Sequence, residues 1–217
     1  MNTFIRRETF FLAFLTLAFL TSVACSDEAV DPARGQQAEP TTYKVSTQEE
    51  YDSVKSQVFD GGDRILFERG REFEGHFSLR RSDLRPGLAI IVADFGAPTS
   101  PRPAIRADAE GMGTLDIRDS GGWHIENLEI TNQSDVFSER HGIYVAAEDS
   151  GTHRDYVIRN CLIRDVTGKQ DYYNNGGITF RVTGSAIPTR FDGVLIESNE
   201  IRDIGGVGIR TKSTWEA

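Results

Sequence analysis

The sequence predicts an all-β fold, a parallel β-helix in which short strands wind into a solenoid. One observation is a pattern of apolar residues two positions apart, then a small amide or hydroxyl residue, then a second apolar stretch. It occurs three times, 33 and 38 residues apart, beginning at Trp123, Tyr156 and Val194. The other is a strand opening at glycine, which follows the copies at Gly142, Gly177 and Gly208. Period-2 alternation indicates strands, and self-similarity at such spacings indicates a repeat architecture.

Short strands and one-residue corners favour a β-helix over a propeller, because propeller blades need hairpin turns. Apolar spacing of two argues against a helical repeat. Each strand of a β-helix pairs with its equivalent one coil later. We therefore expect two stacked interior columns, one of Ile125, Ile158 and Ile196 and one of Ile130, Ile163 and Ile201. Asn127 and Asn160 fall at the corner between them, where asparagine tolerates the left-handed conformation.

The first 25 residues have the features of an export signal. Arg6 and Arg7 precede an apolar stretch over residues 10–20 that is too short to span a membrane comfortably. The stretch ends in a sequence that resembles a bacterial lipoprotein cleavage box at Cys25. We expect acylation of Cys25, which would attach the protein to a membrane by a lipid anchor only. Ser26 favours the outer membrane or cell surface by the same resemblance, and a periplasmic or secreted protein is the alternative.

Residues 26–42 are polar and contain proline and glycine, so they are predicted to form a flexible tether. The β-helix domain is predicted over residues 43–217. A capping box from Ser46 and Thr47 to Glu50 predicts a short helix, with Val54 and Val58 on one face. This helix is expected to cover the first coil of the solenoid.

Less regular strand patterns continue the repeat toward the N-terminus, at residues 64–67, 76–79, 88–92, 104–105 and 114–117. Residues 62–75 and the Asn-corner repeat together resemble the pectate-lyase-like, right-handed parallel β-helix superfamily. The resemblance spans roughly residues 45–212 and includes no complete catalytic motif. It implies a right-handed solenoid that acts on polysaccharide, and it makes calcium a possible cofactor.

The net charge argues against one class of partner, and the cysteine content predicts the state of the one thiol in the β-helix domain. Loss of residues 1–25 removes Arg6, Arg7 and Glu8, which takes the formal net charge from −9 to −10. This acidity argues against nucleic acid as a partner. Cys161 has no disulfide partner if Cys25 is acylated, and it is expected to be a buried, inert thiol.

Outward-facing positions of the glycine-led strands carry the candidate catalytic residues. One outward column contains Tyr144, Thr179 and Arg210, and the next contains Ala146, Arg181 and Lys212. In the resembling lyases, Arg or Lys removes the proton α to a uronate carboxylate whose charge is masked. We therefore take Arg181, Arg210, Lys212 and the preceding His141 as candidate catalytic residues. The alternative is a solvated face whose arginines pair with acidic neighbours.

Long loops at residues 133–140 and 167–175 are expected to project from one edge. The second loop carries Tyr172, Tyr173 and Asn174, which with Tyr144 are candidate sugar-binding residues, because aromatic rings and amides suit carbohydrate. A simple connecting loop is the alternative. Asp165 and Asp203 occupy equivalent repeat positions, as a catalytic or calcium-binding pair or, as we favour, as turn residues beside Arg164 and Arg202.

The sequence thus predicts an exported β-helix protein with lyase-like action on an acidic, uronate-containing polysaccharide. The last strand is followed almost at once by residue 217, so we expect a truncated solenoid. A non-catalytic glycan-binding or cell-surface structural module, or an inactive fragment of a larger enzyme, is the alternative.

Overall fold

The computed structural model describes residues 39–82, 84–168 and 175–214, which form three parallel sheets and one short helix. In spatial order, sheet 1 contains β1 (Thr42–Val45), β2 (Arg64–Glu68), β5 (Ile90–Phe95), β8 (Trp123–Glu126), β11 (Thr152–Arg159) and β14 (Arg190–Glu197). Sheet 2 contains β16 (Val207–Ser213), β13 (Gly176–Thr183), β10 (His141–Glu148), β7 (Gly113–Arg118) and β4 (Phe77–Leu79). Sheet 3 contains β15 (Glu200–Ile204), β12 (Leu162–Val166), β9 (Glu129–Asn132), β6 (Ala104–Ala107) and β3 (Glu72–Glu74).

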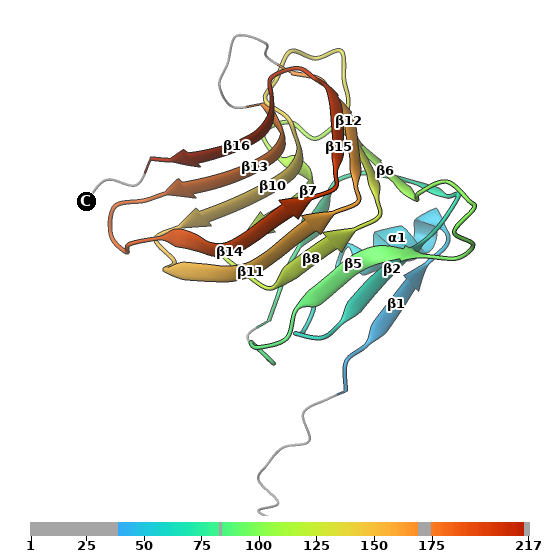
Figure 1. The fold of residues 1–217 in the computed structure, drawn as a ribbon, viewed down its shortest axis with the longest axis horizontal. Helices are drawn as coiled ribbons and strands as arrows, with labels where there is room; N and C mark the ends of the chain where they lie inside the picture. The colour runs from blue at the N-terminus through green and yellow to red at the C-terminus, as the bar shows by residue number, and fades with distance from the viewer. Residues whose placement is uncertain (1–38, 83, 169–174, 215–217) are drawn as a thin grey trace, which may run out of the picture. The chain divides into compact units, whose positions relative to one another are not determined.

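The chain visits the three sheets in turn, so each coil adds one parallel strand to every sheet (Figure 1). Repeats that were recognised in the sequence lie in register on consecutive coils. Ile158 pairs with Ile125 and Ile196 in sheet 1, and the second isoleucine column is aligned in the same way in sheet 3. The predicted right-handed parallel β-helix is thereby confirmed.

Left-handed residues make the corners between sheet 1 and sheet 3. The φ angles of Asn127, Asn160 and Ser198 are 60°, 53° and 55°, and each residue follows the sheet 1 strand of its coil. Asparagine and other short polar residues visit this conformation more readily than other L-residues do. The prediction of a left-handed Asn corner is therefore confirmed, and it explains how one residue turns the chain.

Glycine is the second residue of the sheet 2 strands β10, β13 and β16, and the neighbouring coil leaves no room for a side chain at Gly142 and Gly177. A Cβ atom on Gly142 would lie 2.6 Å from Cγ2 of Ile163 and 2.7 Å from the carbonyl oxygen of Gly177. One on Gly177 would lie 2.6 Å from the carbonyl oxygen of Gly208. The interior columns and the coil spacing thus require glycine at this point of the repeat.

The helix α1 (Gln48–Val54) lies at the N-terminal end of the solenoid (Figure 1). Thr47 caps it, and Glu50 completes the predicted capping box. Tyr51 and Val54 are buried, as expected for a helix that covers the first coil. The expectation for Val58 was wrong, because the helix ends at Val54 and Val58 is 53% exposed.

Aromatic rings fill the core beneath α1. The ring of Tyr51 lies 5.5–6.0 Å from those of Phe67, Phe73 and Phe77, centroid to centroid. Further along the solenoid the core contains stacked isoleucine side chains and a second aromatic cluster of Tyr156, Phe180 and Phe191. Within the described part of the chain, no helix is long and apolar enough to cross a membrane.

Candidate functional site

The outer face of sheet 2 gathers most of the residues that the sequence singled out. Tyr144 of β10 pairs with Thr179 of β13, which pairs with Arg210 of β16. In the neighbouring column, Arg181 lies between Ala146 and Lys212. Both outward columns therefore have the predicted register.

Outward orientation does not make these side chains accessible. Tyr144 is 4% exposed and Thr179 is 2% exposed, because large neighbours on the same face cover them. The ring of His141 stacks on the ring of Tyr144, with centroids 4.4 Å apart and an interplanar angle of 13°. The Arg118 guanidinium carbon lies 5.3 Å from the Tyr144 ring centroid. Tyr144 is thus held between an imidazole and a guanidinium, and its ring faces are unavailable for stacking on a sugar.

His141 is held behind this face by two polar contacts. Its Nδ1 lies 3.0 Å from the Thr179 hydroxyl oxygen, and its Nε2 lies 3.2 Å from Oε1 of Glu139. An ionised carboxylate only accepts hydrogen bonds, so Nε2 carries the proton and Nδ1 accepts from Thr179. Burial lowers the pKa of His141, against the opposing effect of Glu139, and the charge of Arg210 lowers it further. The imidazole is therefore neutral at neutral pH, and it contributes to the outer face of sheet 2 by stacking on the Tyr144 ring.

An acidic and a basic residue of β7 complete the face, and the sequence reading missed both. Nε and Nη2 of Arg118 lie 2.8 and 3.1 Å from the two carboxylate oxygens of Asp116, which is 2% exposed. The signal that could have found them is the alternation over residues 114–117. Extending the outward columns one coil back places Asp116 beside Tyr144 and Arg118 beside Ala146, as the structure does.

Arg181 and Arg210 differ from several outward arginines of the other sheets. Several arginines of the other sheets have a carboxylate beside them, as in the pairs Arg106–Glu72, Arg159–Glu126 and Arg164–Glu129, although the exposed Arg64 and Arg190 form no ion pair within the described residues. Arg181 and Arg210 form no ion pair with any residue that the structure describes.

The donors of these two arginines are also incompletely used. Nη1 of Arg181 lies 3.4 Å from the Tyr144 hydroxyl oxygen, and this is a long, weak contact. Nε of Arg181 and Nη1 of Arg210 are buried and have no hydrogen-bond partner within the described residues. Buried polar groups are normally satisfied, so such donors call for an explanation. The guanidinium charges are also left without a carboxylate of the described chain beside them.

A shallow pocket of about 360 Å³ opens over the C-terminal ends of β7, β10 and β13. We call it the arginine pocket. It is lined by Arg118, Asp119, Tyr144, Ala146, Ala147, Glu148, Arg181 and Thr183. Ala146 pairs with Arg118 on one side and Arg181 on the other, and its small side chain leaves the space between these two arginines. Arg210 lies one strand beyond Thr179 in sheet 2, and Lys212 is the next neighbour of Arg181.

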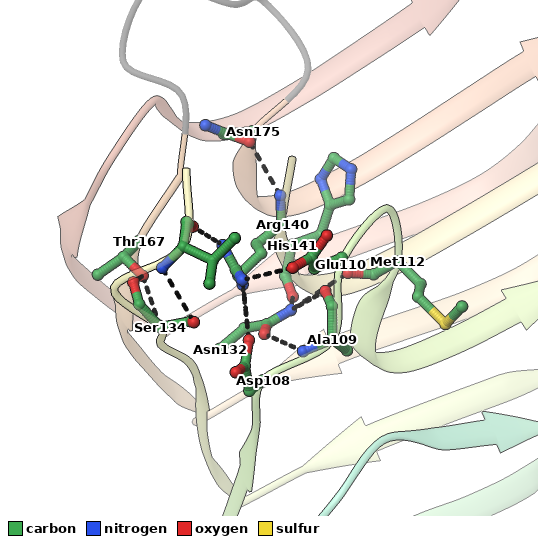
Figure 2. Close-up of polar contacts among 11 residues, drawn as sticks. Asp108, Ala109, Glu110, Met112, Asn132, Ser134, Arg140, His141, Thr167 and Asn175 are labelled. Carbon is green, nitrogen blue, oxygen red and sulfur yellow. Dashed lines mark hydrogen bonds and ion pairs between the residues drawn. The ribbon is translucent and has the colours of Figure 1, made fainter. Parts of the chain in front are cut away.

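A buried polar corner lies at the opposite end of these strands, where β9 passes into β10 (Figure 2). Arg140 is fully buried and donates to Asp108 at 2.8 Å and to the carbonyl oxygen of Val136 at 2.7 Å. The Asn132 side chain donates to the main-chain carbonyls of Ala109, Met112 and His141. These contacts join the loops to one another and to the ends of β9 and β10, so the corner is structural and fixes the start of β10.

The described ends of the two long loops meet at this corner, as expected for loops on one edge. The Ser134 main-chain N–H donates to the Thr167 hydroxyl at 2.8 Å, and the Arg140 N–H donates to Oδ1 of Asn175 at 2.9 Å (Figure 2). The candidate sugar-binding residues Tyr172, Tyr173 and Asn174 lie outside the described residues.

The repeated aspartates are not in turns as expected but inside β12 and β15, where each has a left-handed backbone. Asp165 and Asp203 have φ angles of 51° and 55°, and each pairs with the arginine that precedes it, Arg164 or Arg202. Among the described residues, no group of three or more His, Cys, Asp or Glu side chains could hold a metal ion. Cys161 is fully buried, as predicted, and burial raises the pKa of its thiol to about 12.

The fold has counterparts among solved structures. No family model and no curated protein matches the sequence. Two structures of the GH136 lacto-N-biosidase from Eubacterium ramulus are similar to the chain. The selenomethionine derivative has a TM-score of 0.52 at 21% sequence identity, and the native protein has 0.53 at 20%. Each match covers 69% of this chain and 34% of the other, so the chain spans about a third of the length of those proteins. At this level of identity the likeness shows the fold, a parallel β-helix.

Proposed function

We propose that the chain acts on a glycan at the arginine pocket and that the sugar unit held there is acidic. The observation that carries the proposal is Arg181, which lines the pocket and has no carboxylate partner in the described chain; Arg210, outside the lining on β16, also has none. A guanidinium matches the geometry of a carboxylate and forms charge-assisted hydrogen bonds with it. The protein is acidic overall, so attraction to an anionic glycan has to come from this local basic surface.

Lyase-like chemistry is the finer form of this proposal. In such a reaction a base removes the proton α to the uronate carboxylate, and the C–O bond at the β carbon breaks. The leaving oxygen takes a proton, and a carbon–carbon double bond remains in the other product. Pairing of Arg181 with the carboxylate makes the α proton more acidic, and Arg210 and Lys212 on the next strand are the candidate bases. His141 supports the site by holding Tyr144.

Glycoside hydrolysis is the second candidate. It needs two carboxyl groups that flank the scissile bond, and the arginine pocket contains Glu148 and Asp119. Glu148 forms no ion pair with a residue that the structure describes, so it is available to a ligand. The likeness to a lacto-N-biosidase makes hydrolysis worth testing, although it reaches no further than the fold. The alternative is a glycan-binding module without catalysis, which a direct assay distinguishes from a lyase and from a hydrolase.

One assay distinguishes these outcomes. The full chain is incubated with alginate, pectin and glycosaminoglycans, and both ultraviolet absorbance and new reducing ends are followed. A lyase raises both signals, because its product contains an unsaturated uronate. A hydrolase raises only the reducing ends, and a binding module raises neither but retains the glycan in a binding assay.

The arginine pocket itself is tested with Arg181→Ala, and Arg64→Ala serves as a matched control on the exposed face of β2. Loss of a charge-assisted contact of about 1.5–3 kcal/mol predicts affinity for an acidic glycan lower by roughly 10- to 100-fold. Arg64→Ala is expected to bind as the wild type does. Unchanged affinity in Arg181→Ala, or no binding of any acidic glycan by the wild type, would contradict the proposal.

A further inference from the structure

A second, larger pocket lies beside the arginine pocket, at the turns that lead from sheet 2 to sheet 1. We call it the corner pocket. Its volume is about 620 Å³, and its lining comes from the turn after β7, from Ser150 and the first half of β11, and from residues 81, 86 and 87 of an earlier coil. Asp119 lines both pockets. A ligand longer than one sugar unit that leaves the arginine pocket past Asp119 therefore enters the corner pocket.

A hydrogen-bonded group of three side chains forms the wall at this junction. The Ser150 hydroxyl lies 2.7 Å from Oδ1 of Asp119 and 2.9 Å from Nε2 of His153. The ionised carboxylate can only accept, so the single hydroxyl proton of Ser150 goes to Asp119 and His153 donates to the serine oxygen. In a serine nucleophile the histidine accepts the hydroxyl proton instead. The arrangement is therefore suited to binding and not to acyl transfer.

The cationic side chains of the corner pocket already have hydrogen-bond or ion-pair partners. Arg81 donates to the carbonyl oxygens of five residues, Arg85, Pro86, Leu88, Gly121 and Gly122. Nε of Arg154 lies 2.9 Å from Asp192, and His124 lies 2.9 Å from Asp155. Burial lowers the pKa of His153, so this side chain is neutral at neutral pH. The corner pocket thus differs from the arginine pocket, where Arg181 has no carboxylate partner among the described residues.

Main chain forms much of the floor of the corner pocket. A Cβ atom on Gly121 would lie 2.3 Å from the carbonyl oxygen of Arg154, so this position is restricted to glycine by the next coil. At Gly122 a Cβ atom would lie 2.3 Å from Nη1 of Arg81, so the main chain here packs against its neighbours, and hydroxyl, imidazole and carboxylate groups line the pocket around it. Neutral donors and acceptors in the lining suit the hydroxyl groups of an uncharged sugar.

We propose that the corner pocket is a second glycan subsite that binds an uncharged sugar unit adjoining the acidic unit in the arginine pocket. Arginines that already have partners and the Asp119–Ser150–His153 group select against a second anion and toward hydroxyl groups. The ligand of the whole surface is then a mixed glycan in which a uronate neighbours a neutral hexose. This inference rests on the proposed function of the arginine pocket, which it extends from one unit to two.

The test uses the purified full chain on an array of three kinds of oligosaccharide. These are uronate-only chains, chains in which a uronate alternates with a neutral hexose, and neutral chains. The variants are Ser150→Ala, His153→Gln and Arg181→Ala, and Ser53→Ala on the exposed side of α1 is the matched control. Circular dichroism and urea unfolding establish that each variant is folded, and His153→Gln replaces Ser150→Ala if the latter is not.

The wild type is expected to bind the alternating chains more tightly than the uronate-only chains. Ser150→Ala and His153→Gln should remove that preference by lowering the affinity for the alternating chains roughly 5-fold, for one lost neutral hydrogen bond of about 1 kcal/mol. They should leave uronate-only binding unchanged, whereas Arg181→Ala should weaken both. Equal wild-type binding of the two acidic kinds, or a preference that survives the corner variants, overturns the second subsite alone.

Two further outcomes separate the subsite from the proposed function. Binding of neutral chains alone, with loss in Ser150→Ala or His153→Gln, supports the corner pocket as a sugar site and overturns the acidic assignment of the arginine pocket. Absence of binding to all three kinds overturns both proposals.

Discussion

The burial and protonation of individual side chains in sheet 2 depend on the residues beside them on the same face. His141 is almost fully buried, yet both ring nitrogens have partners, Thr179 and Glu139. A buried imidazole in such a place favours the neutral form, because burial penalises the charge. Stability should therefore depend on pH partly through this residue, together with His153, whose pKa burial also lowers.

The prediction is a loss of stability as the pH falls below about 6.5. Burial lowers the pKa of His141 in the folded protein, whereas the unfolded chain takes up a proton near the ordinary value of about 6.5. Between the two pKa values the unfolded state binds more protons, so the free energy of unfolding decreases with falling pH. Urea unfolding between pH 7 and pH 5 measures this slope, and His141→Gln should make it shallower. Carboxylates contribute equally to both proteins, so identical slopes would contradict the prediction.

Residue chemistry in the arginine pocket was only partly predictable from the sequence. Arg181, Arg210 and Tyr144 could be placed on one face because their strands repeat the glycine-led pattern. Asp116 and Arg118 were missed because β7 has no such repeat around it, although its alternation is clear in retrospect. Burial of Tyr144 was unpredictable, since it depends on which large side chains stand next to it on neighbouring coils.

At the scale of elements, strand register follows directly from the repeat. A shift of one residue would turn every inward side chain outward, so matching apolar columns fix the pairing of β8 with β11 and of β11 with β14. Helix α1 was predictable from its capping box, and its last turn was not, since Val58 suited the helical spacing but lies beyond the end at Val54. For α1, the local sequence therefore predicted the first residues better than the last.

The left-handed corners supply the prediction at this scale. Asn160 has φ 53° and is exposed, so its backbone conformation, and not its packing, accounts for the residue type. Asn160→Gly should keep the free energy of unfolding near that of the wild type. Asn160→Ala should lower it by about 1 kcal/mol, because a Cβ atom disfavours the left-handed region. Urea unfolding measures both.

The matched control for Asn160→Ala is Arg190→Ala, at an exposed position of β14 that lies outside the left-handed region. A change within about 0.5 kcal/mol is expected there. Equal destabilisation by Asn160→Gly and Asn160→Ala would show that the corner depends on the asparagine side chain instead.

For the whole molecule, the acylation of Cys25 is a prediction on residues that the structure does not describe. A chain with this anchor should be labelled by radioactive palmitate when it is produced in a Gram-negative bacterium, and it should fractionate with membranes. Cys25→Ser should abolish the label. Cys161→Ser is the matched control, because the buried Cys161 thiol is out of reach of the acylating enzyme. Labelling that persists in Cys25→Ser would show that the cleavage-box resemblance is misleading.

Burial along the solenoid is uneven, and it sets how much each coil contributes to stability. Ile178 and Ile209 occupy the same column of sheet 2 on neighbouring strands, but Ile178 is fully buried and Ile209 is 47% exposed. Ile178→Ala should lower the free energy of unfolding by about 2–5 kcal/mol, through lost apolar burial and the cavity left behind. Ile209→Ala removes the same atoms from a half-exposed site, so its cost should stay near 1 kcal/mol. Urea unfolding of the two variants compares the same substitution at a buried site and at a half-exposed site. A loss at Ile209 as large as that at Ile178 would mean that further protein covers the β14, β15 and β16 edge in solution.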